Sequence, residues 1–174
     1  MEVSLLTPKC TLVPAKFFDP SSATEVLEKV ARLSTMDEVK YVDVPQYDAV
    51  LVYSESVEDQ YSKIISEDGI AGGTGEAKPE MFYILRDLSR CEDYNRILAT
   101  YADGHLYLAI AQGDTLLLSN VYKAVDFTTA EYFIFLAMKS LQLNPEVSTI
   151  CWRMPISEEE EMSLYRYFKS VEQF

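Results

Sequence analysis

Cysteine, glycine and proline are all scarce in this chain of 174 residues, and each shortage excludes a class of protein. The three cysteines, at positions 10, 91 and 151, are odd in number and widely spaced, with no C-x-x-C pair. This argues against a disulfide framework and favours a reducing compartment, so we expect a cytoplasmic protein. The six glycines and seven prolines are too few for long disordered tracts.

Histidine is scarcer still, because His105 is the only one. A histidine-rich metal site is therefore excluded, and the place of His105 beside a turn is typical of a solvated strand end. Cys91 follows Arg90, whose charge could lower the pKa of the thiol. Because no base lies near it in the sequence, we interpret Cys91 as a structural thiol, with a redox role as the remote alternative. We expect no metal and no cofactor.

Basic residues are the third shortage: 15 Lys and Arg stand against 28 Asp and Glu, which gives a formal net charge of −13. Such a charge repels nucleic-acid phosphates and anionic membrane surfaces. The N-terminus has no basic segment followed by a long apolar one, so we expect no signal peptide. The most apolar helical stretch, residues 130–143, is too short to span a bilayer, so we expect no membrane insertion and no nucleic-acid partner.

Hydrophobic residues, by contrast, make up 48% of the chain, with 12 Tyr and 8 Phe, which is enough for a full core. In the first half, apolar runs and capping signals predict a series of short elements. Strands are predicted at 3–6, 10–13, 39–44 and 49–53, the last of them central in its sheet. A first helix begins at a capping box at Ser22–Glu25 and ends near Ser34. A second helix begins at Ser56–Asp59 and includes Ile64 and Ile65.

The glycine-rich segment Glu67–Pro79 holds four of the six glycines. We interpret it as a flexible loop between two lobes, over 1–78 and 79–174, and not as a phosphate loop, because no strand precedes its Gly72–Gly75 run and acidic residues follow it.

The second half predicts a clearer order of elements. After a helix at 80–87 come three strands at 96–101, 105–111 and 115–122, a helix opened by a capping box at Thr128–Glu131, a buried strand at 149–152, and a final helix capped by Ser157. This order, a three-strand meander followed by helix, strand and helix, is that of a ribonuclease-H-like lobe. The fold class that we predict is therefore α/β with a mixed sheet: an actin-like or ribonuclease-H-like lobe preceded by a partial, smaller α/β lobe.

Two stretches carry a resemblance to a known family. The first is Thr11–Pro14 followed by Phe17 and Phe18, and the second runs from Ala124 to Phe133 and on to Leu143–Glu146. On these residues, and over nearly the whole chain, the sequence resembles an uncharacterised bacterial family of unknown function. The resemblance implies an actin-like ATPase fold and assigns no residue a chemical role. It also implies that strands which precede Thr11–Pro14 in the family are missing here, so that the first lobe is incomplete.

The pair Asp103 and Gly104 stands where an actin-like ATPase has a phosphate-binding hairpin. That hairpin needs backbone amides turned toward the phosphate and a carboxylate near the metal. Here no Ser or Thr enters the following strand, and no Gly-Gly pair follows the late strand, at 153–156. We therefore interpret the pair as a type I′ turn, or at most as a degenerate cofactor-binding hairpin. A nuclease site is disfavoured because the strands at 96–101 and 149–152 carry no acid.

The helix over 130–143 has apolar residues almost all round, which predicts that it is buried all round. One side can pack on the sheet, and the other needs either the second lobe or a partner. Tyr132, Phe133 and Phe135 are the candidate interface residues. The sequence thus predicts a non-catalytic protein-binding or scaffold module that binds a protein partner or forms a homodimer. The alternative is an actin-like ATPase with weak ATP affinity.

Overall fold

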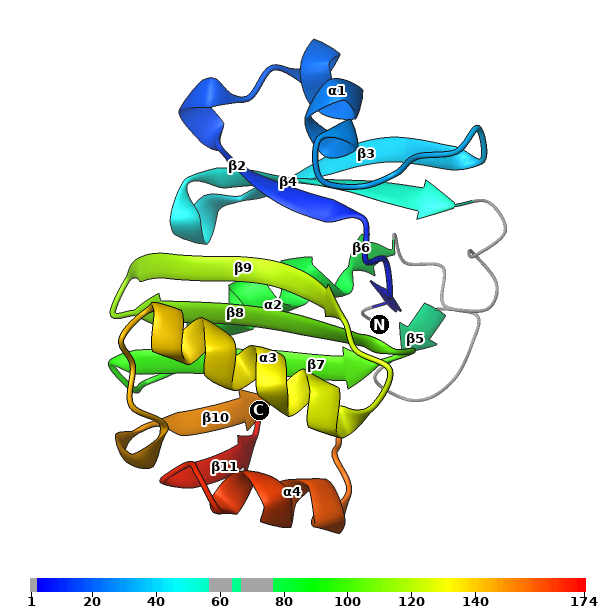
Figure 1. The fold of residues 1–174 in the computed structure, drawn as a ribbon. Coiled ribbons are helices and arrows are strands. Elements are labelled where there is room, and N and C mark those ends of the chain that lie inside the picture. Colours follow the sequence, from blue (N-terminus) through cyan, green and yellow to red (C-terminus); the bar gives the residue numbers. More distant parts are fainter. Residues whose placement is uncertain (1–2, 57–63, 67–76) are drawn as a thin grey trace. The chain divides into compact units, whose positions relative to one another are not determined.

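The computed structural model describes residues 3–56, 64–66 and 77–174 (Figure 1). The chain divides into two compact units, residues 1–83 and 84–174, and the division falls inside helix α2 (Glu80–Leu88). The first unit has two small sheets and the second has one larger sheet, and each unit has its own core. We describe them one at a time.

The first unit contains a three-stranded antiparallel sheet in the order β2-β4-β3. Its strands are β2 (Cys10–Pro14), β3 (Asp37–Val44) and β4 (Ala49–Ser56). The central place of β4 confirms the prediction, and the reason is the unbroken apolar run Ala49–Tyr53, all of it buried. Helix α1 (Ala23–Glu28) packs on this sheet through Ala23 and Leu27, which form a small core with Val52.

A second small sheet in this unit joins β5 (Ile64–Ser66), β1 (Val3–Leu5) and β6 (Lys78–Pro79), with β1 in the middle. The helix predicted at Ile64 and Ile65 is wrong, because Ile64–Ser66 forms a strand that pairs antiparallel with β1. The spacing of apolar residues cannot predict a pairing between segments so far apart in the sequence. The predicted start of that helix, at Ser56–Asp59, lies mostly outside the described residues, as does most of the predicted loop Glu67–Pro79.

The capping box predicted at Ser22–Glu25 is wrong. Ser22 precedes α1, but its hydroxyl donates to the carbonyl oxygen of Asp19 and caps nothing. Asp19 instead accepts from the amide of Ser21 and opens a short 3-10 turn at Pro20–Ser22. The helix runs only to Glu28 and not to Ser34.

The second unit is built on a mixed five-stranded sheet in the order β11-β10-β7-β8-β9. The antiparallel meander β7 (Asn95–Ala102), β8 (His105–Gln112) and β9 (Thr115–Lys123) confirms the three predicted strands. Strand β10 (Thr149–Trp152) then pairs parallel with β7. The final strand β11 (Ser170–Gln173) pairs parallel with β10 and was not predicted.

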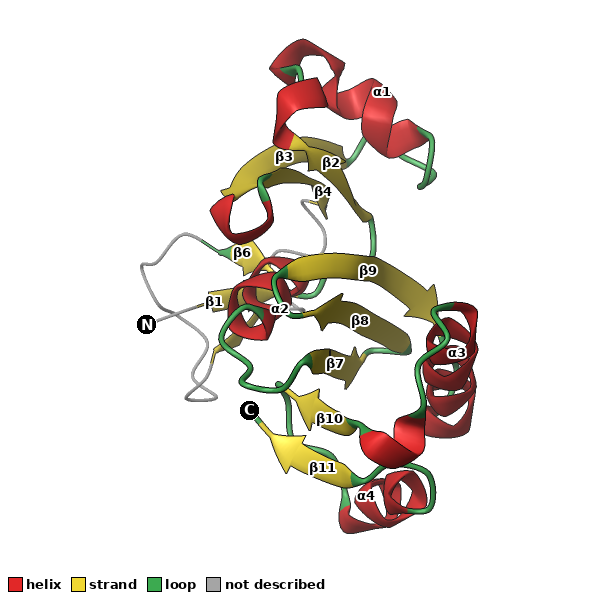
Figure 2. Ribbon diagram, turned by 90° about the vertical axis from the view of Figure 1, so that its left-hand side faces the viewer, coloured by secondary structure: helices red, strands yellow, loops and turns green. Residues whose placement is uncertain are grey.

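Helices α3 (Phe127–Ser140) and α4 (Glu158–Tyr165) cover one face of this sheet (Figure 2). The main core lies between them and the sheet, where Ile97, Leu108 and Trp152 meet Ile134 and Leu164. Side chains of a strand alternate between faces. Ile150 and Trp152 therefore point into this core, and Cys151 points to the other face of the sheet.

The two helices of this unit begin differently. Ser157 caps α4 in a complete capping box with Glu160, as predicted. The box predicted at Thr128–Glu131 is wrong, because Asp126 is the N-cap of α3 and accepts from the amide of Thr129 at 2.7 Å. Glu131 lies one turn further along and is buried.

No helix in the described part of the chain has both the length and the apolar character that crossing a bilayer requires.

Candidate functional site

The predicted phosphate hairpin forms the two-residue turn between β7 and β8. Ala102 pairs with His105, so Asp103 and Gly104 are the whole connection. Their φ angles are +51° and +69°, and two successive positive φ angles define the type I′ turn. The interpretation of the pair as such a turn is confirmed.

Both carbonyl groups of this turn bind the protein itself. The carbonyl oxygen of Gly104 accepts from the amide of Ala124 at 2.8 Å, and that of Asp103 lies 2.8 Å from Nδ1 of His105. The turn is thereby fastened to the segment that leads from β9 into α3. These contacts give Asp103 and Gly104 a structural role, and phosphate binding by the pair stays a prediction.

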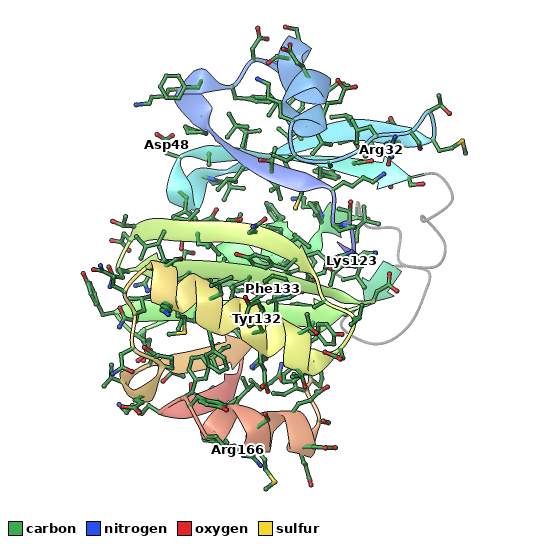
Figure 3. The ribbon with its side chains drawn as sticks, viewed as in Figure 1. Arg32, Asp48, Lys123, Tyr132, Phe133 and Arg166 are labelled. Carbon is green, nitrogen blue, oxygen red and sulfur yellow. The ribbon has the colours of Figure 1, made fainter. Side chains whose placement is uncertain are left out.

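The predicted interface residues lie together on α3 but in three different environments. Tyr132 is 61% exposed, whereas Phe133 and Phe135 are half-buried. The ring of Phe133 stacks on Tyr122 of β9 at 4.8 Å between centroids, and Phe135 packs against Tyr167 at 4.8 Å. Figure 3 shows Tyr132 and Phe133 as neighbours on the helix. Phe133 and Phe135 thus anchor α3, and Tyr132 stands in solvent.

The helix is therefore not buried all round, which corrects the prediction made from its composition. Its inner side, with Ala130, Ile134 and Met138, is fully buried, while Leu136 is 47% exposed. The exposed positions follow the helical period and form one narrow face. They are Thr128, Tyr132, Leu136, Lys139 and Ser140, which we call the outer face of α3.

A cavity of about 220 Å³ in the first unit is a feature that the sequence did not reveal. Three segments distant in sequence line it, 5–9, 34–37 and 54–56, and a hydrogen-bonded group sits in its wall. Asp37 accepts from Lys9 Nζ at 2.8 Å and from Ser54 Oγ at 2.6 Å. The cavity is smaller than most sites for small molecules.

Burial by itself would raise the pKa of Asp37, but the hydrogen bonds from Lys9, from the amide of Ser34 and from Ser54 outweigh it and hold the pKa well below its usual range. Asp37 is therefore a fixed anion that orders this wall. In the residues that the structure describes, no three His, Cys, Asp or Glu side chains are grouped so as to hold a metal ion.

Comparison with protein-family models decides the membership of the chain. Residues 2–171 match a family model described as a protein of unknown function (DUF3822). The chain belongs to the DUF3822 family. This confirms the resemblance to a family of unknown function that the sequence suggested. No curated protein matches this DUF3822 member.

A solved structure extends the comparison to the fold. A protein from Bacteroides thetaiotaomicron VPI-5482, described as having an actin-like ATPase fold and unknown function, matches with a TM-score of 0.73 at 15% sequence identity. The match covers 97% of this DUF3822 chain and 66% of that protein. The DUF3822 chain therefore has the actin-like ATPase fold that was predicted, and it spans about two thirds of the length of the protein it matches. At this identity the likeness shows the fold alone.

Proposed function

We propose that this chain is a non-catalytic protein-binding module on an actin-like fold, and that it binds its partner through the outer face of α3. The observation that carries the proposal is the exposure of Tyr132 and Leu136, one helical turn apart, on a helix that is otherwise anchored in the core. Each large apolar side chain left in water forgoes roughly 1.5–3 kcal/mol of burial. Contiguous exposed apolar groups of this kind mark binding surfaces more often than single ones.

Aromatic contacts hold α3 in place beneath its outer face. Phe133 is stacked on Tyr122, and Phe135 lies against Tyr167 and Phe168. On the outer face itself, the ring centroid of Tyr132 is 5.5 Å from that of Phe133. A helix held in this way needs little ordering when a partner binds, which favours affinity.

The charge of the outer face indicates the chemistry of the partner. Although the chain carries 28 acidic residues, Lys139 is the only charged residue on this face. Arg166, another exposed cation, precedes Tyr167, whose ring contacts Phe135. A segment with apolar and acidic side chains fits this surface. A second copy fits less well, because two chains of net charge −13 repel each other.

Site-specific photocrosslinking tests the proposal. A photoreactive amino acid replaces Tyr132 in the protein as it is expressed in its native host. The matched control carries it at Tyr94, a 70% exposed tyrosine of the same unit. We expect one heterologous crosslinked species from position 132 and none from position 94. Its yield falls at least about tenfold when Leu136→Ser is added, since one hot-spot contact is worth about 1.4 kcal/mol or more.

Two results would contradict the proposal. A crosslinked product of twice the mass of the chain would mean that the outer face binds a second copy, as the homodimer alternative predicts. Equal yields from positions 132 and 94 would mean that the outer face of α3 is ordinary surface.

A further inference from the structure

Cys91 and Cys151 are 60 positions apart in sequence, yet their side chains lie close enough to interact in the second unit. The Cys91 thiol also lies 3.7 Å from the carbonyl oxygen of Asp87. Cys91 lies just after α2 and is half-buried, whereas Cys151 is in the middle of β10 and is 9% exposed. Neither thiol is in a disulfide. Cys10 belongs to the first unit.

The sheet explains why Cys151 is available to this contact. Its strand neighbours Ile150 and Trp152 point into the main core, so Cys151 faces the opposite side, together with its ladder partners Leu98 and Glu172. Arg96 is two residues before Leu98 on β7 and therefore faces the same side.

Arg96 holds the segment that carries Cys91 against this side of the sheet. Its Nε donates to the carbonyl oxygen of Asp93 at 3.0 Å and its Nη1 to that of Ser89 at 3.4 Å. A second tie comes from Asp87 near the end of α2, whose Oδ2 accepts from Arg153 Nη1 at 3.0 Å, just beyond β10. The chain between Asp87 and Asp93 is thus fixed at both ends over Cys151.

The surroundings of the pair lower the pKa of Cys91, first through Cys151 and then through Arg96. The hydrogen bond from Cys151 lowers the pKa of Cys91, and so does the guanidinium of Arg96, while burial and the carboxylates of Asp93 and Asp87 act in the opposite direction. The same hydrogen bond, together with burial, raises the pKa of Cys151. The cation that lowers the pKa of Cys91 is Arg96 and not Arg90, the cation that the sequence suggested. Nη1 of Arg90 instead lies 3.6 Å from Oδ1 of Asp87.

We propose that Cys91 and Cys151 form a redox-active dithiol, in which Cys91 reacts first with hydrogen peroxide and Cys151 resolves the product to an intramolecular disulfide. In the first step the Cys91 thiolate attacks one peroxide oxygen, the O–O bond breaks, hydroxide leaves, and Cys91 becomes a sulfenic acid. In the second step the sulfur of Cys151 attacks that of Cys91, the S–O bond breaks, an S–S bond forms, and water leaves with the proton of Cys151. Two electrons pass from the thiols to the peroxide.

The two steps have a built-in order. While Cys91 is a thiolate, its hydrogen bond keeps Cys151 protonated and unreactive. Once Cys91 is a neutral sulfenic acid, the largest cause that raises the pKa of Cys151 is removed, while burial and the carboxylates of Glu172 and Asp93 remain. The more exposed thiol of the pair is the one that reacts first, which matches the access that an oxidant has.

Peptide mapping of the full chain after treatment with one equivalent of hydrogen peroxide tests this. We expect a Cys91–Cys151 disulfide, the loss of two hydrogen atoms from the intact mass, full reversal by dithiothreitol, and a Cys10 that can still be alkylated. In C151S, Cys91 should instead accumulate as a sulfenic acid that dimedone traps. In the reduced wild type, iodoacetamide should modify Cys91 about tenfold faster than Cys10, because the thiolate is the reactive form.

The proposal is overturned if the oxidised wild type keeps three free thiols, or if Cys91 appears only in disulfides between chains. An alkylation rate of Cys91 equal to that of Cys10, whose pKa burial raises to about 12, would also overturn it. The wild-type mapping needs no variant, so it decides the matter even if C151S fails to fold.

Discussion

At the scale of single residues, Asp37 is a heavily engaged carboxylate of the first unit. Its side chain is 4% exposed and accepts three hydrogen bonds, from Lys9, Ser34 and Ser54. It joins β3 to β4 and to the segment before β2. A buried anion of this kind stabilises the fold only while all of its donors are in place.

Replacing Asp37 by asparagine should therefore destabilise the first unit. The substitution removes the negative charge and turns one carboxylate oxygen into an amide nitrogen, which cannot accept from the ammonium group of Lys9. We expect the free energy of unfolding at pH 7 to fall by roughly 1–3 kcal/mol, less than for a fully buried ion pair because Lys9 is 35% exposed. Urea unfolding followed by circular dichroism, with hydrogen exchange of peptides from residues 37–56, measures it.

The difference between wild type and D37N should also depend on pH. The pKa of Asp37 is lower in the folded chain than its unfolded value of about 3.9. Its contribution is therefore complete above that value and is lost as the pH falls toward the folded pKa. The difference should be constant from about pH 5 to 7 and shrink below about pH 4. Asp43→Asn, an exposed acid of the same strand, is the control; an equal effect of the two variants would contradict the argument.

Residue chemistry could be predicted from the sequence only where it is local. The type I′ turn at Asp103 and Gly104 follows from two adjacent residues, so it was predictable. The partner of Cys91 was not, because Cys151 reaches it only through the pairing of β10 with β7. The bonds of Asp37 to Lys9 and Ser54 depend in the same way on the assembled first sheet.

At the scale of elements, the helix caps separate a correct prediction from two wrong ones. Ser157→Ala should cost about 1 kcal/mol of stability, because Ser157 Oγ accepts from the amide of Glu160 and completes a capping box. Thr128→Ala should change little, since Thr128 lies inside α3 and Asp126 is its cap. Thermal unfolding of the two variants measures this, and a larger loss for Thr128→Ala would reverse the assignment of the caps.

Strands that form only because a distant strand pairs with them could not be predicted from the sequence. The strand at Ile64–Ser66 exists because β1 offers it an edge, and β11 exists because β10 does. Neither has the alternation or the flanking turn residues that mark a strand by itself. The meander β7 to β9, by contrast, carries its turns in the sequence, and it was predicted to within one or two residues.

At the scale of the whole molecule, an actin-like ATPase fold need not bind a nucleotide. Titration of the chain with ATP and Mg²⁺ in a calorimeter should give no dissociation constant in the low micromolar range. The reasons are the hairpin without a following hydroxyl, the absence of a Gly-Gly pair at 153–156, and a net charge of −13 that opposes a polyphosphate. Titration with Mg²⁺ alone is the control. Micromolar binding would favour the ATP-binding alternative over the protein-binding proposal.

The burial of Trp152 has a practical consequence for spectroscopy. It is the only tryptophan of the chain, it is 1% exposed, and its ring lies 5.5 Å from that of Phe127. Tryptophan emission therefore reports on the second unit alone, while far-ultraviolet dichroism reports on both. If the two signals change at different denaturant concentrations, the units melt separately; if they coincide, the chain unfolds as one cooperative body. The molecule thus carries its own fluorophore for measuring how strongly its two halves are coupled.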